Sequence, residues 1–185
     1  MLSLSIIKLT VLKFSKFTTK SFRIITFYYV IIILINNYVI HQHNAERAGL
    51  HYDFRIECYI PDLNKNMLLS FATRKFPDLI YKNKKRILLL ETELHDLYWL
   101  NFEGDIPYGY GKGTMKIWDK GTYQLIEGKD LFSEYKKGVF KIILESNQGK
   151  FKKLSLSVVR TDKINMSFNY KNKKTWLCIK KDLIV

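Results

Sequence analysis

Short apolar runs separated by turn residues dominate the chain from residue 38 to its C-terminus. They are rich in Ile, Val, Leu, Tyr and Phe, and several alternate apolar with polar positions, the period of a strand with one buried face. Strands are predicted at 38–41, 51–59, 67–73, 86–91, 114–118, 121–126, 138–144, 153–159 and 175–180. Short strands at this spacing predict a mostly β protein, either a barrel or a sandwich.

The segments between the predicted strands are rich in Pro, Gly, Asn and Asp. Asp119-Lys120-Gly121 is predicted to turn the chain between the two strands that flank it. The glycine-rich stretch 108–114 lacks the spacing of a phosphate-binding P-loop and has no helix after it, so a tight turn between strands is favoured. One helical turn is predicted at 130–137 and a polar loop at 161–174.

The N-terminal 36 residues differ from the rest of the chain. They carry five basic residues and no acidic one, and the run 24–35 is apolar apart from Thr26. A membrane-spanning helix needs ~20 apolar residues, so this run is short for one. A membrane anchor, part of an organelle-targeting leader and a first buried strand all stay open for it. We predict a short N-terminal extension over 1–36, of uncertain structure, and one domain over 37–185.

The composition fits a single globular domain with a basic surface. Of the 185 residues, 47% are hydrophobic and 15% aromatic, which is ample for a core. The net charge of +14 favours a polyanionic partner, either nucleic acid or an anionic membrane surface. Cys58 and Cys178 lie far apart and form no metal-binding motif, which predicts buried thiols in a reducing compartment. An intracellular location is therefore expected, in the cytoplasm or nucleoid, or in an organelle if 1–36 is a targeting leader.

One predicted strand carries an unusual set of polar residues. His51, Asp53 and Arg55 alternate along it, so they share one face, while the apolar residues between them share the other and are predicted to be core. Imidazole, carboxylate and guanidinium groups together suit a divalent metal and a phosphate. The alternative is the solvent face of an edge strand with only a His–Asp hydrogen bond. His43, just upstream, and the basic chain favour the site.

Seven sequence blocks then follow one another in order to the C-terminus. They are His43…Leu50-His51-Tyr52-Asp53-Phe54-Arg55-Ile56-Glu57, Ser70-Phe71-Ala72-Thr73-Arg74-Lys75, His95…Asn101-Phe102-Glu103-Gly104-Asp105-Ile106-Pro107, Tyr110-Gly111-Lys112-Gly113-Thr114, Ile117-Trp118-Asp119-Lys120-Gly121-Thr122-Tyr123, Val158-Val159-Arg160 and Trp176-Leu177-Cys178-Ile179-Lys180. Together they resemble the 3′-phosphoesterase domain of bacterial DNA ligase D and its stand-alone relatives. The resemblance implies a single small β-barrel domain. It also implies a metal-dependent DNA-repair enzyme that removes a 3′-phosphate or a 3′-terminal ribonucleotide and leaves a ligatable 3′-hydroxyl.

The resemblance also implies roles for individual residues. His43, His51 and Asp53 would be metal ligands, Arg55 a nearby catalytic residue, and His95 a contact to the scissile phosphate. The implied metal is Mn²⁺, with Zn²⁺ or Co²⁺ as alternatives, and nitrogen ligands plus a carboxylate suit such metals. The implied substrates are DNA 3′ ends, such as a primer–template with a terminal ribonucleotide, and a separately encoded DNA ligase is a candidate partner.

Basic residues near the blocks are candidates for phosphate and DNA contacts. They are Arg74, Lys75, Arg86, Lys112 and Arg160. A family arginine falls nearest Arg86 but with its register off by one, which would reverse its face.

The chain departs from the family pattern at three places near the predicted site. Two residues are added within 46–49, His41 stands where the family usually has glutamine, and Trp99 stands where it has tyrosine, with Tyr98 adjacent. A reduced activity is therefore left open.

Two other functions compete with this interpretation. A non-catalytic basic module would bind nucleic acid, or a membrane surface through 24–35, with salt-dependent affinity and no turnover. A non-haem iron oxygenase would use His51, Asp53 and His95 as its two histidines and carboxylate. The ordered blocks have no role in the oxygenase, and Arg160 is only a distant candidate for holding its co-substrate, so it ranks lower.

Overall fold

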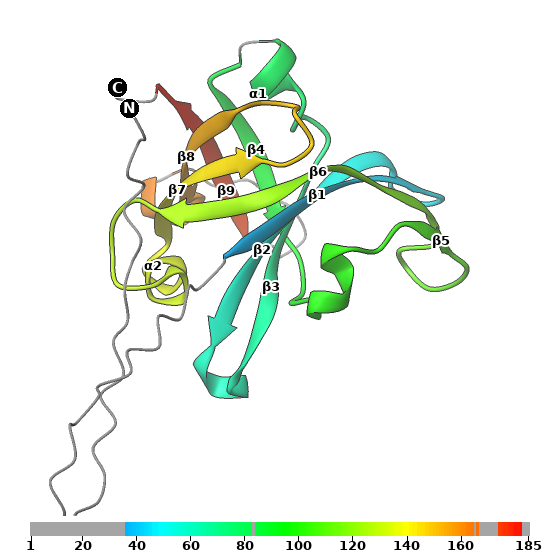
Figure 1. The fold of residues 1–185 in the computed structure, drawn as a ribbon, viewed down its shortest axis with the longest axis horizontal. Helices are drawn as coiled ribbons and strands as arrows, with labels where there is room; N and C mark the ends of the chain where they lie inside the picture. The colour runs from blue at the N-terminus through cyan, green and yellow to red at the C-terminus, as the bar shows by residue number, and fades with distance from the viewer. Residues whose placement is uncertain (1–35, 83, 165, 167–173, 183–185) are drawn as a thin grey trace, which may run out of the picture. The chain divides into compact units, whose positions relative to one another are not determined.

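The computed structural model describes residues 36–82, 84–164, 166 and 174–182 (Figure 1). The apolar run 24–35 and nearly all of the predicted extension lie outside these residues, as does much of the predicted loop 161–174. Within the described part of the chain, no helix has the length and apolar character to cross a membrane.

The described strands form a closed antiparallel barrel, which confirms the mostly β, barrel-type fold (Figure 1). The strands are β1 (Asn37–Ala45), β2 (Gly49–Ile60), β3 (Lys65–Thr73), β4 (Arg86–Glu91), β5 (Gly104–Ile106), β6 (Gly113–Leu125), β7 (Val139–Ser146), β8 (Lys153–Arg160) and β9 (Thr175–Lys181). Their order is β1-β2-β3-β4-β9-β8-β7-β6, and pairing of β1 with β6 closes the ring. The short β5 adds to the outer edge of β6. Within the described residues every barrel strand therefore has two neighbours, although β3 and β4 pair only at Phe71–Glu91 and Ala72–Leu90.

Helical segments in the described residues are few and short. They are α1 (Asp78–Tyr81), α2 (Leu131–Lys137) and the 3₁₀ turns η1 (Pro61–Leu63), η2 (Leu97–Leu100) and η3 (Thr161–Ile164). The predicted helical turn at 130–137 is confirmed as α2, whose N-cap Asp130 accepts a hydrogen bond from the Ser133 amide.

The predicted turn at Asp119-Lys120-Gly121 is wrong, because β6 runs straight through it. The pairing of β6 with β1 shifts register between Ile40 and His41, which marks a β-bulge at this point. Gly121 is needed for close strand approach, since a Cβ there would overlap the carbonyl oxygen of Glu145 on β7. Two predicted strands are therefore one long strand. The glycine-rich stretch 108–114 is confirmed as a tight connection, between β5 and β6.

The core fills the inside of the barrel with large side chains. Phe54, Phe71, Phe140 and Trp176 are essentially buried and contact one another in a chain of ring pairs. Both cysteines, predicted to be buried, are free and buried. On β2 the apolar residues face this core, as predicted, so the intervening polar residues face outward.

A segment following β4, residues 92–106, covers that outward face and is called the covering segment below. Its start lies beside β3, where the amide of His95 bonds to the Leu68 carbonyl and the Leu68 amide returns the bond. It then crosses the barrel through η2 and returns as β5, so that Trp99 and Phe102 lie against residues of β1 and β2. The part of the polar face around Arg55 and His41 is therefore covered by this segment.

Candidate metal centre

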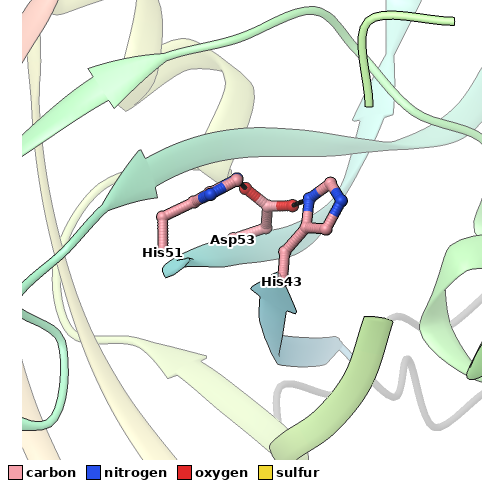
Figure 2. A group of neighbouring side chains, drawn as sticks. All are labelled: His43, His51 and Asp53. Carbon is pink, nitrogen blue, oxygen red and sulfur yellow. Dashed lines mark ion pairs between the residues drawn. The ribbon is translucent and has the colours of Figure 1, made fainter. Parts of the chain in front are cut away.

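The three predicted metal ligands converge at the turn end of the β1–β2 pair (Figure 2). The strand register sets His43 directly opposite His51, and their rings lie 4.7 Å apart between centroids. Asp53 lies two residues beyond His51 on the same face, with its carboxylate between the rings. One potential ligand atom from each residue lies within 4.8 Å of the other two. The structure thus contains a possible metal-binding site made of His43, His51 and Asp53.

Backbone carbonyl groups fix the tautomer of both imidazole rings. A carbonyl oxygen only accepts, so His43 donates from Nε2 to Gly111 at 2.8 Å and His51 donates from Nδ1 to Gly49 at 2.9 Å. The other nitrogen of each neutral ring therefore carries a lone pair. Those nitrogens, His43 Nδ1 and His51 Nε2, each lie 3.4 Å from an Asp53 carboxylate oxygen.

Two lone pairs directed at a carboxylate repel it unless a cation lies between them. The Asp53 carboxylate favours a cation at this place, either a metal ion or a proton on an imidazole ring. Burial favours the neutral His51 ring, but Asp53 outweighs it and raises the pKa of His51 above its ordinary value. Burial alone would raise the pKa of Asp53, yet His43, His51 and Arg55 hold it well below the usual range. A carbonyl-held imidazole beside an ionised carboxylate is the arrangement that metal-binding histidines adopt. The residues therefore fit a metal ion.

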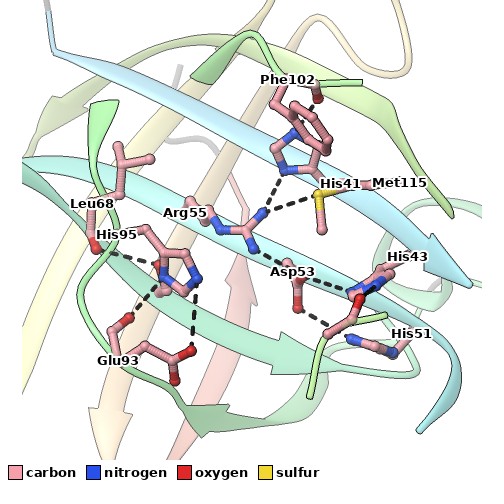
Figure 3. A network of polar contacts seen from close by, with 12 residues as sticks. His41, His43, His51, Asp53, Arg55, Leu68, Glu93, His95, Phe102 and Met115 are labelled. Carbon is pink, nitrogen blue, oxygen red and sulfur yellow. Dashed lines mark hydrogen bonds and ion pairs between the residues drawn. The ribbon is translucent and has the colours of Figure 1, made fainter. Parts of the chain in front are cut away.

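Arg55 is buried beside the three candidate ligands (Figure 3). Its Nη2 donates to Asp53 Oδ2 at 3.1 Å, and its Nη1 donates to His41 Nδ1 at 2.6 Å and approaches the Met115 sulfur at 3.7 Å. The guanidinium carbon lies 5.2 Å from the centroid of the Trp99 ring. Its Nε–H has no partner, and it is the only such buried side-chain atom in the described part of the chain. An unsatisfied buried donor on a charged group costs free energy unless a ligand accepts from it.

His95 lies on the other side of Arg55 from the three candidate ligands (Figure 3). Its Nδ1 donates to the Glu93 carbonyl at 2.9 Å, and its ring lies 5.7 Å from that of Trp99. Burial and the charge of Arg55 lower its pKa, so the neutral ring is favoured, and its Nε2 lies 3.8 Å from the Glu93 carboxylate. The structure thus places both predicted catalytic residues beside the same cluster. The oxygenase ligand set is not formed, because within the described residues His43, and not His95, joins the group.

Some of the predicted phosphate-binding residues surround the cluster. Arg74, just after β3, donates to the carbonyl of Ala48 in the β1–β2 turn at 2.8 Å, and Lys75 follows it. Lys112, next to the Gly111 carbonyl that holds His43, forms an ion pair with Glu46 at 2.8 Å. Arg74 and Lys112 therefore lie at the β1–β2 turn, and together with Lys75, the residue after Arg74, they are called the basic rim below.

The structure does not bring Arg86 and Arg160 to the cluster. Arg86 starts β4 and pairs with Ile179 of β9. Arg160 ends β8, which is four strands from β2 in either direction around the barrel, and it is bonded to Asp162 at 2.8 Å. Any part they play in binding DNA would be away from the candidate metal.

Sequence reasoning missed how His41 and Trp99 contribute to the site. Both were noted only as departures from the family pattern, whereas both contact Arg55 directly. The signal for His41 was its alternation with His43 along β1, which puts both on the polar face. Trp99 gave no such signal, because it reaches the site only through the path of the covering segment.

This protein is thus a closed β-barrel with a cluster of two histidines and one carboxylate on its outer wall. The sequence model of the DNA ligase D 3′-phosphoesterase domain matches residues 41–154, and the chain belongs to that family. It is 44% identical over 90 residues to the multifunctional non-homologous end joining DNA repair protein LigD of Mycobacterium tuberculosis, covering 48% of this chain and 10% of that protein. The LigD proteins of Mycolicibacterium smegmatis and Pseudomonas aeruginosa are 41% and 39% identical over 91 and 87 residues, covering 48% and 46% of this chain and 10% and 9% of their own lengths. The matched region is therefore about a tenth of each of these curated relatives.

Proposed function

We propose that this protein is a metal-dependent phosphoesterase that processes the 3′ ends of DNA. The observation that carries the proposal is the orientation of two imidazole lone pairs toward one carboxylate, beside a buried arginine with an unused donor. Its family membership and the repair proteins that it resembles support the same reaction class.

The bound metal would supply Lewis-acid polarisation of a phosphoryl oxygen and a more acidic water. His43, His51 and Asp53 would hold it, leaving positions open for substrate and water. Mn²⁺ suits this mixed nitrogen and oxygen set, as do Zn²⁺ and Co²⁺.

The protein's own residues would stabilise charge and move protons. Arg55 would donate from its unpaired Nε–H to a phosphoryl oxygen as negative charge develops in the transition state. His95, with Nδ1–H committed to Glu93, has Nε2 available to accept a proton from attacking water. General acid catalysis by His95 would instead require the protonated ring, which its lowered pKa disfavours.

The proposed substrate is a DNA 3′ end bearing a phosphate or a terminal ribonucleotide, and the product a 3′-hydroxyl. The basic rim of Arg74, Lys75 and Lys112 would contact the phosphates of the approaching strand. A DNA ligase that seals the resulting hydroxyl would be the functional partner, by analogy with the end-joining proteins that the chain resembles.

A primer-end assay tests the function. The full chain is incubated with Mn²⁺ and labelled primer–templates ending in 3′-phosphate, 3′-ribonucleotide or 3′-hydroxyl, with Arg55→Lys as the comparison variant. Conversion of the first two ends to a 3′-hydroxyl that a ligase can seal is expected, with much slower conversion by the variant because lysine cannot reproduce the guanidinium contacts. Salt-dependent DNA binding without turnover under Mn²⁺, Zn²⁺ and Co²⁺ would replace this proposal with the non-catalytic module.

A further inference from the structure

We propose that His41 is a positioning residue that sets the orientation of Arg55 and links it to the covering segment. His41 accepts a hydrogen bond from Arg55 Nη1 at Nδ1, at 2.6 Å, and lies 3.0 Å from the Phe102 carbonyl at Nε2. The inference takes the catalytic role of Arg55 from the proposed function. The hydrogen bonds that join His41 to Arg55 and to Phe102 do not depend on that function.

The hydrogen-bond partners of His41 fix its tautomer. A guanidinium only donates, so Nδ1 must accept, and a carbonyl only accepts, so Nε2 must carry the proton (Figure 3). The side chain is fully buried, so bulk solvent does not compete for either bond. His41 therefore offers one acceptor and one donor in opposite directions, and both are used.

This arrangement excludes His41 from the metal ligands, although it alternates with His43 on β1. His43 and His51 each keep one nitrogen free for a cation, whereas His41 keeps none. The register is part of the difference, because His41 lies opposite Asp53, whereas His43 lies opposite His51. The bulge has its extra residue, Trp118, on β6, so β1 keeps its alternation and His41 stays on the outer face, where its ring bonds to Arg55 and to the covering segment.

The bond to His41 also limits how Arg55 shares Asp53 with a metal. Arg55 Nη2 already bonds Asp53 Oδ2, one of the two carboxylate oxygens beside the histidine lone pairs. Holding Nη1 at His41 keeps the guanidinium from turning fully onto that carboxylate. Without it, Arg55 and the metal would compete directly for Asp53, and the unpaired Nε–H would lose its fixed direction.

The test compares His41→Leu with His41→Gln in the full chain. A glutamine amide carries an acceptor oxygen and a donor nitrogen, so it can restore both bonds, whereas leucine restores neither. His41→Leu is expected to lower kcat by ~10–100-fold and to weaken Mn²⁺ binding by about tenfold, the range for residues that orient a site. KM should change far less than kcat. His41→Gln should recover most of both losses.

Two readouts do not depend on turnover. Nitrogen NMR of ¹⁵N-labelled protein should show His41 as a neutral ring protonated at Nε2, and the Arg55 Nε signal should shift in His41→Leu. Paramagnetic resonance of free Mn²⁺ gives its affinity directly.

Thr161→Val is the control, because it removes a buried hydroxyl, bonded to Thr175 at 2.6 Å, on the far side of the barrel. It should change neither readout.

The results separate this inference from the proposed function. An Nδ1-protonated His41 overturns the inference, and so does a folded His41→Leu protein with wild-type Mn²⁺ affinity and Arg55 signal. A glutamine variant as impaired as the leucine variant does the same. If the wild type processes no DNA end, the function fails, while the NMR and Mn²⁺ measurements still decide the role of His41.

Discussion

The two faces of β2 have opposite characters although they alternate residue by residue. The inner face presents Phe54 and Ile56 to the barrel core, where both are fully buried. The outer face presents Asp53 and Arg55, which are also buried, but against polar partners, a tryptophan ring and the covering segment. Burial alone therefore does not distinguish core from site on this strand. The distinction is that the inner face packs apolar side chains together, whereas the outer face holds two imidazole nitrogens against one carboxylate and an Arg55 N–H without a partner.

The comparison predicts that the outer face controls metal binding and activity. Asp53→Asn should reduce Mn²⁺ affinity and turnover by more than ~100-fold, the upper end of what orienting residues cost, because a ligand and the charge between the histidines are both lost. Calorimetric Mn²⁺ titration and the primer-end assay measure the two effects.

Glu57→Gln is the matched control for Asp53→Asn. Glu57 lies on the same face of β2, buried, but its oxygens accept from Asn37 and Asn66 rather than facing the cluster. It should bind Mn²⁺ like the wild type. An Asp53→Asn protein with unchanged Mn²⁺ affinity would rule out the proposed ligand set.

The inner face should instead control stability. Phe54→Ala should lower the free energy of unfolding by about 3–5 kcal/mol, because a large side chain packed against Phe71 and Phe76 leaves a cavity. Denaturant unfolding measures the loss. The fraction that stays folded should bind Mn²⁺ with near wild-type affinity, and loss of affinity without loss of stability would contradict the division between the faces.

A glycine on β6 tests whether the barrel wall itself sets the cluster geometry. Gly113 has a backbone φ of 149°, and a Cβ there would overlap the Asn44 carbonyl oxygen next to His43. Gly113→Ala should therefore move β1 away from β6, with a stability loss of roughly 1–3 kcal/mol from backbone strain and weaker Mn²⁺ binding. Unfolding and Mn²⁺ titration are the measurements.

Gly49→Ala is the control for Gly113. It also has a positive φ, 68°, but a Cβ added there would meet no atom within 4 Å, so only the backbone strain remains. Its stability loss should be the smaller of the two. Equal losses would mean that strand contact at Gly113 is unimportant.

The contrast between the two faces of β2 also explains what the sequence could predict. Alternation along β2 is a local property, so it revealed which residues share a face, and the order of the blocks revealed the family and the three residues of the possible metal-binding site. The joining of two predicted strands into β6 was missed, because Asp119 and Gly121 look like turn residues. In the structure Asp119 is buried and bonded to Tyr38 and Ser146. Such long-range partners leave no local pattern.

The surroundings of Arg55 were equally beyond local reasoning. Trp99 contacts Arg55, and Phe102 contacts its partner His41, from a segment more than 40 residues away from Arg55. The path of that segment depends on a two-bond bridge between His95 and Leu68. Tertiary placement of an irregular segment has no periodicity to read.

Removing a polar contact inside the barrel should also lower stability, but by less than removing an inner-face side chain of β2. Tyr38 donates to the buried Asp119 carboxylate at 2.6 Å. Tyr38→Phe should lower the free energy of unfolding by ~1–2 kcal/mol, since Ser146 still satisfies one carboxylate oxygen. Denaturant unfolding should show the loss, and Mn²⁺ affinity should not change. A stability equal to the wild type would mean that another donor replaces the hydroxyl.

The smallest expected effect concerns how far the outer-face site extends over the surface. Arg74 lies at the β1–β2 turn beside the cluster, while Arg160 lies on the opposite side of the barrel. Arg74→Gln should weaken primer–template binding a few-fold and reduce the slope of log affinity against log salt by about 1, the change for one lost phosphate contact. Arg160→Gln should leave both unchanged, because a strand end held at the cluster does not reach it. Fluorescence anisotropy across a salt series measures both. Equal losses in the two variants would show that DNA contacts the barrel on both sides, and that the basic charge serves general binding rather than delivery of a 3′ end to the candidate metal.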